Sequence, residues 1–164
     1  MYKRQEKNGI RIIVLDTLYP SHHTGRFTGD QLDWLKEELH SDYNRPTIIA
    51  FHHPIYRPWL PILGKIFDSV QRDQFYQIIE GCNVLAVLNG HLHHNLLTNV
   101  DGVLHSQASS TYIELFYNDV EYWTKNTLNF NQCIIQNAAF YVNNLVLPFD
   151  GRILGKGSLQ ILLQ

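Results

Sequence analysis

The chain has 164 residues, of which 45% are hydrophobic and 17% are charged, and its formal net charge is −2 at pH 7. A chain of this length and composition can bury a core of its own, so we expect a single domain over residues 1–164. The small net charge gives no electrostatic footprint for nucleic acid or an anionic membrane, and no stretch is apolar for long enough to span a bilayer.

The two cysteines, Cys82 and Cys133, are far apart in sequence and belong to no Cys-x-x-Cys pair. This usage favours a reducing compartment over a disulfide framework, although a single bridge stays open as an alternative. The start of the chain is basic but is followed by only a short apolar run, so it does not read as a signal peptide. We therefore expect a cytoplasmic protein.

In chain order, the first predicted element is a buried strand at Ile10–Leu15, followed by a loop at Tyr19–Gly25. A helix is predicted from Thr28 to about Leu39, with a capping-box pattern formed by Thr28 and Gln31. Leucines at three- and four-residue spacing give this helix one apolar face for the core.

Next come a second buried strand at Thr47–Phe51 and a loop rich in proline and aromatic residues at Pro54–Gly64. A helix at about Ser69–Glu80 and a third buried strand at Val84–Leu88 follow. Strands that alternate with helices in this way indicate the α/β class, in which parallel strands are covered on their faces.

The later part of the chain predicts strands only. An Asp-Gly pair at positions 101 and 102 is typical of a hairpin turn. The predicted late strands are Leu96–Val100, Val103–Gln107, Cys133–Leu147 and Arg152–Leu163. The segment Asn118–Asn131 is polar and ambiguous.

Two histidine clusters lie where predicted strands end. His52 and His53 follow the second buried strand, and His91, His93 and His94 follow the third. Imidazole is a common metal ligand, and two histidines one residue apart point the same way in an extended backbone, so we expect His91 and His93 to share a cavity. The carboxyl ends of parallel strands line the crevice where open α/β sheets bind ligands.

The other histidines have more than one interpretation. His53 would point away from its neighbour in an extended chain, as would His94, which suggests that they support ligands by hydrogen bonds or lie on the surface. His22 and His23 occupy a loop that could reach a substrate, and a solvated loop is the alternative. His105 is expected on the surface of its strand.

These residues carry a family resemblance. The order Gly25-x-x-x-x-x-Gln31-Leu32-x-Trp34-Leu35, Phe51-His52-His53-Pro54, Gly90-His91-Leu92-His93 resembles the second half of a calcineurin-like metallophosphoesterase. It is similar in particular to the branch that cleaves cyclic nucleotides and glycerophosphodiesters, and the resemblance runs from about position 10 to about position 113.

The resemblance implies part of a four-layer α/β/β/α sandwich that lacks its first half, so that residues 1–164 would form the carboxyl-terminal half of the domain. It also implies two divalent transition-metal ions (Mn, Fe or Zn) held side by side at the sheet edge. His52 and His91 would bind one ion and His93 the other, while a core histidine satisfied by backbone is the alternative for His52.

Three acidic elements of the family's first half, Asp-x-His, Gly-Asp-x-x-Asp and Gly-Asn-His-Asp/Glu, are not present in working form. Asp16 has no histidine two positions later and is interpreted as a turn residue, and Gly29–Asp33 matches only in lettering because it begins a helix. Two divalent ions about 4 Å apart repel by roughly 16 kcal/mol at an effective dielectric of 20, which neutral imidazoles do not offset. We therefore expect an incomplete two-metal site.

The leading hypothesis is a metal-dependent phosphoesterase that hydrolyses a small phosphodiester such as a cyclic nucleotide, incomplete as this chain alone. The alternative is a catalytically silent remnant that serves as a binding or assembly module. By resemblance, part of the cover of the buried strands comes from elements that the chain lacks. We therefore expect a homo-oligomer, unless the segment from Cys133 onward folds back over the strands.

Overall fold

The computed structural model describes residues 2–56, 66–118, 121–137, 139–147 and 150–158. Most of the predicted loop Pro54–Gly64 lies outside these residues, as does the end of the last predicted strand. Among the described residues, neither helix is long and apolar enough to cross a membrane.

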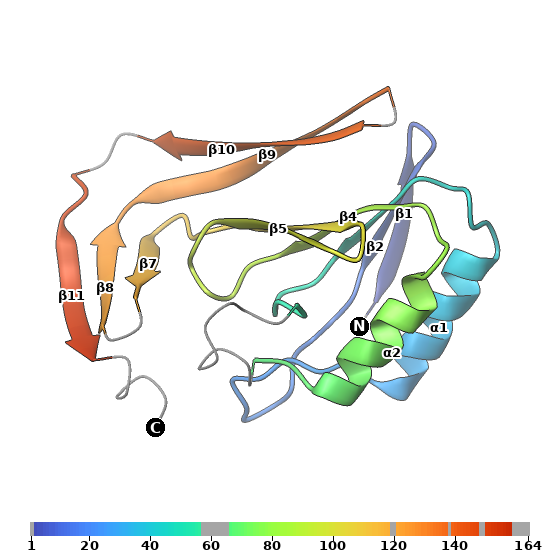
Figure 1. Cartoon of the computed structure of the whole chain (residues 1–164), viewed down its shortest axis with the longest axis horizontal. Coiled ribbons are helices and arrows are strands. Elements are labelled where there is room, and N and C mark those ends of the chain that lie inside the picture. The colour runs from blue at the N-terminus through green and yellow to red at the C-terminus, as the bar shows by residue number, and fades with distance from the viewer. Residues whose placement is uncertain (1, 57–65, 119–120, 138, 148–149, 159–164) are drawn as a thin grey trace.

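The main sheet has six strands in the order β1-β2-β3-β4-β6-β5 (Figure 1). The four inner strands run parallel, and an antiparallel strand closes each edge. The strands are β1 (Lys3–Lys7), β2 (Ile10–Val14), β3 (Thr47–Ala50), β4 (Val84–Asn89), β5 (Leu96–Val100) and β6 (Val103–Gln107). The predicted α/β class and its three buried strands are confirmed.

Two helices, α1 (Gly29–His40) and α2 (Ser69–Ile79), lie side by side on one face of this sheet (Figure 1). Their apolar faces bury Leu35, Leu39 and Phe75 completely. Both predicted helices are confirmed, but the capping box of α1 is only half formed. The Thr28 hydroxyl accepts a hydrogen bond from the Gln31 backbone N–H, while the Gln31 side chain pairs with the backbone of the segment after β2.

A long hairpin of β9 (Leu128–Gln136) and β10 (Ala139–Leu147) crosses the face of the sheet opposite the helices (Figure 1). Its contact with β6 is polar, since the Asn131 side-chain amide donates to the Ser106 hydroxyl and the Gln107 carbonyl. The predicted strand Cys133–Leu147 is therefore wrong as one strand. The chain reverses at Asn137, whose φ is +53°, and folds back to form a third layer.

A second, antiparallel sheet in the order β11-β8-β7 lies past the β5 edge of the main sheet (Figure 1). Its strands are β7 (Ile113–Tyr117), β8 (Glu121–Asn126) and β11 (Ile153–Ser158). Sequence patterning did not resolve β7 and β8, because nearly all their side chains are half-buried and the alternation of polar and apolar residues is weak. The helices, the main sheet and the β9–β10 hairpin thus form an α layer, a β layer and a second β layer of the expected sandwich.

His105 on β6 is buried rather than on the strand surface as predicted, with 0% exposure. Helices cover one face of this inner strand and the β9–β10 hairpin covers the other. The His105 Nε2 atom lies 3.1 Å from the Tyr76 hydroxyl, and burial lowers the pKa of the imidazole to about 4.

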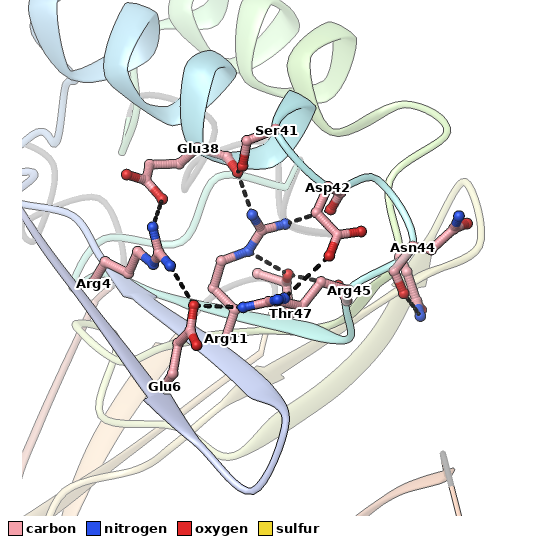
Figure 2. Close-up of polar contacts among 10 residues, drawn as sticks. Arg4, Glu6, Arg11, Glu38, Ser41, Asp42, Asn44, Arg45 and Thr47 are labelled. Atoms are coloured by element: carbon pink, nitrogen blue, oxygen red, sulfur yellow. Dashed lines mark hydrogen bonds and ion pairs between the residues drawn. The ribbon is translucent and has the colours of Figure 1, made fainter.

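The buried guanidinium of Arg11 joins β2, β3 and the end of α1 (Figure 2). Arg11 is 2% exposed, and its Nε donates to the Thr47 hydroxyl at 3.0 Å. Its two terminal nitrogens donate to the carbonyl of Glu38 in the last turn of α1 and to the carbonyl of Asp42 just past the helix. The ion pairs around it, which include Arg45 with Asp42, are exposed and contribute little.

We predict that Arg11→Met lowers the free energy of unfolding by about 2–3 kcal/mol, because it removes the three hydrogen bonds that the buried guanidinium donates to Thr47, Glu38 and Asp42. Chemical denaturation measures this directly. Arg45→Met is the matched control, since its exposed ion pairs are each worth less than about 1 kcal/mol. Equal losses in the two variants would contradict the role assigned to Arg11.

Candidate metal centre

The parallel register of β3 and β4 brings the two histidine clusters to the same sheet edge. Ala50 pairs with Leu88, and the backbone pairing continues beyond both strands. The Phe51 N–H donates to the Leu88 carbonyl, and the Gly90 N–H donates to the His52 carbonyl, both at 3.0 Å. These bonds hold the loop that begins at His52 beside the loop that begins at Gly90.

Three imidazoles meet between these loops. His52 Nε2 lies 3.2 Å from His91 Nδ1, and the ring of His53 is centred 4.4 Å from that of His91. One ring nitrogen from each lies within 4.8 Å of the others. Among the described residues, these three form the one group of at least three His, Cys, Asp or Glu side chains whose possible ligand atoms lie so close together. Two ligands of a tetrahedral ion, each about 2.0–2.1 Å from it, are roughly 3.3–3.4 Å apart, close to the His52–His91 distance.

His93 lies beside the cluster without joining that group. The argument from an extended backbone was wrong here, because His91 has a φ of +70° and His93 a φ of +49°, both left-handed. The His93 side chain is exposed, and its charge would lower the pKa values of His52 and His91. Its role as the ligand of a second ion stays a prediction.

His53 is buried and turned into the cluster, because the backbone at positions 52 and 53 is bent rather than extended. Its Nδ1 lies 2.8 Å from the hydroxyl of Thr17, a residue that sequence reasoning missed. The available signal was position: Thr17 follows β2, whose carboxyl end lies beside that of β3. Next to it, the Asp16 carboxylate accepts the Leu18 backbone N–H at 2.9 Å.

The remaining candidate histidines lie around the cluster. His94 is half-buried, its Nδ1 is 3.1 Å from the Leu115 carbonyl, and it therefore contacts β7 rather than the site. In the loop after β2, His22 stacks on Tyr19 at a centroid distance of 3.9 Å. His23 is exposed in the same loop, and its charge would lower the pKa of His91.

The pKa values of the three clustered imidazoles are lowered, which favours their neutral form, although His52 is exposed and only His53 is buried. Desolvation is the largest cause that lowers the pKa values of His52 and His53, and it lowers that of His91 to about 4. The charges of neighbouring histidines act in the same direction. Neutral imidazoles offer lone pairs, so this donor set suits a divalent transition ion.

No known family profile matches the chain, but individual relatives do. It is 41% identical over 106 residues to a cAMP/cGMP dual specificity phosphodiesterase from Mycobacterium tuberculosis, which covers 63% of this chain and 32% of that protein. It is 36% identical over 104 residues to a probable cyclic nucleotide phosphodiesterase from Rhodococcus erythropolis, covering 63% and 34%. The chain thus spans about a third of the length of these relatives.

Solved structures agree at the level of the fold. A dimetal phosphatase from Danio rerio superposes with a TM-score of 0.51 at 13% identity, covering 76% of this chain and 57% of that one. GAP50, the anchor in the inner membrane complex of Plasmodium, gives 0.54 at 10% identity, covering 96% and 52%. The resemblance to cyclic nucleotide phosphodiesterases of the metallophosphoesterase type is confirmed, as is the partial α/β/β/α fold.

We predict that the metal-free protein loses stability as the pH falls from about 6.5 to about 4. The unfolded chain binds a proton at His91 in this range and the folded chain does not, so unfolding becomes more favourable, by at most about 1.4 kcal/mol per pH unit for each such group. Denaturation with chelator present, at a series of pH values, measures the slope.

His91→Gln should flatten part of this slope and leave the share that comes from buried His105. His22→Gln makes the same chemical change at an exposed loop position and serves as the control. An identical pH profile in His91→Gln and wild type would show that the cluster is not held neutral by its surroundings.

Proposed function

We propose that this chain supplies the histidine side of a metal-dependent phosphodiesterase centre whose substrate is a small phosphodiester such as a cyclic nucleotide. The observation that carries the proposal is the convergence of His52 and His91, whose ring nitrogens lie 3.2 Å apart at the carboxyl ends of two parallel strands. In this proposal they bind one divalent ion, and the adjacent His93 is available to a second. Similarity to cyclic nucleotide phosphodiesterases supports the substrate class.

A bound Mn, Fe or Zn ion would supply positive charge for the phosphoryl oxygens and activate water. The protein's part is to hold the imidazoles through the paired strand ends and to present the His22–His23 loop toward the substrate. The described group contains three imidazoles and no carboxylate. Because a second ion would be repelled by roughly 16 kcal/mol at 4 Å and a dielectric of 20, we expect one bound ion per chain.

We predict that zinc binds at one site per chain and that His91→Ala weakens its affinity at least tenfold, which isothermal titration calorimetry measures. His40→Ala is the matched control, because His40 lies at the end of α1 and bonds the Ile78 carbonyl rather than the cluster. Equal affinity in wild type and His91→Ala would overturn the metal site.

The activity of this chain alone should be at background. With manganese, we expect it to hydrolyse bis-(p-nitrophenyl) phosphate no faster than His91→Ala, since no carboxylate of the described cluster positions a nucleophile. Robust turnover that disappears in the variant would contradict this expectation. Asp16, at the end of β2, would then be the first carboxylate to test.

The second candidate function is an assembly module without catalysis, and the outer face of the β9–β10 hairpin favours it. Cross-strand pairs place Phe130 with Leu145 and Ile134 with Tyr141 on the face that points away from the main sheet. Their exposures are 41%, 37%, 39% and 52%. The polar pair of Gln132 and Asn143 lies between these two apolar pairs. Several large apolar side chains exposed on one face are typical of a contact surface, and we propose that a homo-oligomer covers it.

We predict that the wild type is an oligomer at micromolar concentration and that Tyr141→Ser shifts it toward monomer, because the substitution removes apolar area from the shared face. Light scattering coupled to size exclusion measures the mass. Asn143→Ser, a polar change on the same face, is the control. A monomeric wild type would leave this face without the proposed role.

A further inference from the structure

We propose that His53 is a third ligand of the same ion and that Thr17 is the residue that positions it, an inference that rests on the proposed function. The family resemblance assigns His52 and His91 to one ion, and an extended backbone at His53 predicts either a supporting hydrogen bond or surface exposure for that residue. In this chain His53 belongs instead to the group whose ring nitrogens all lie within 4.8 Å of one another. Thr17 and Gly25 fix it there.

Thr17 contacts His53 at two atoms. Its hydroxyl oxygen lies 2.8 Å from His53 Nδ1 and accepts the His53 backbone N–H at 3.3 Å. Both residues are buried, at 1% and 6% exposure, so water does not compete for these bonds. With Nδ1 engaged by the hydroxyl, Nε2 is the ring nitrogen that remains to face an ion. A histidine ligand commonly donates its other ring N–H to an oxygen in this way, which fixes its tautomer and orientation.

Gly25 closes the other side of the His53 ring. A Cβ atom at position 25 would lie 2.5 Å from His53 Cβ and Cγ and 2.7 Å from Nδ1, distances that side chains do not tolerate. The backbone cannot retreat freely, because the Gly25 N–H donates to the Ile66 carbonyl at 2.7 Å and its carbonyl accepts the Asp68 N–H at 3.3 Å. The absence of a side chain at Gly25 thus makes room for the imidazole beside the other two.

Three imidazoles around one ion leave a fourth position open, as in zinc sites that bind a water or a substrate oxygen. The rings of His52 and His53 make this possible from adjacent positions because they lie nearly perpendicular, at 85°, with centroids 4.9 Å apart. Sharing one ion among His52, His53 and His91 does not require His93, which stays exposed at the side of the cluster.

Two measurements test this inference. Long-range ¹H–¹⁵N NMR of the wild type should show His53 protonated at Nδ1, and zinc should shift its Nε2 signal. In calorimetry, His53→Gln should weaken zinc binding at least tenfold, and Thr17→Val should weaken it roughly 10- to 100-fold and change the His53 tautomer. Thr17→Ser keeps the hydroxyl and should restore both the affinity and the tautomer.

The outcomes separate this inference from the proposed function. If His91→Gln loses zinc while His53→Gln and Thr17→Val bind it as tightly as the wild type, His53 is not a ligand and the proposed function stands. If the wild type binds no zinc, the proposed function fails, and this inference fails with it. A wild-type His53 protonated at Nε2 overturns the inference without any substitution, so it stays testable even if Thr17→Val does not fold.

Discussion

The structure of the site depends on a backbone hydrogen bond from the Gly90 N–H to the His52 carbonyl, just beyond the ends of β3 and β4. This bond continues the parallel pairing past the strands and keeps the loop that begins at His52 level with the loop that begins at Gly90. A slip of one residue between these strands would move every side chain to the opposite face. His52 and His91 would then no longer be neighbours, so the register of two apolar strands determines the chemistry.

The position of Thr17, which follows the carboxyl end of β2, depends in the same way on the register between β2 and β3. Arg11 pairs with Thr47 at the start of β2 and β3, and its guanidinium fixes that pairing to the end of α1. At the other end of these strands, the chain emerges at Thr17 beside His53. The buried guanidinium of Arg11 at the amino ends of these strands thus helps to place the Thr17 hydroxyl at their carboxyl ends, although Arg11 itself is remote from the imidazoles.

Hydrophobic runs and caps were enough to predict the buried strands and the two helices, because packing and local propensity agree there. They could not place His53, since its orientation depends on the bent backbone after β3 and on Thr17, a residue 36 positions away. His105 was misplaced because the sequence around it gives no sign that its side chain faces helix α2 and contacts Tyr76 there. The turn at Asn137 was missed within a run that reads as one strand.

The cluster of His52, His53 and His91 contains no carboxylate, and this affects both the binding of a first metal ion and the binding of a second. The lowered pKa values of the imidazoles favour their neutral form, in which the ring nitrogens can bind an ion near pH 7. Neutral ligands, however, reduce none of the charge that a second ion would meet. The three histidines therefore favour one ion with an open position, and phosphodiester hydrolysis by two ions would require acidic groups from outside this cluster.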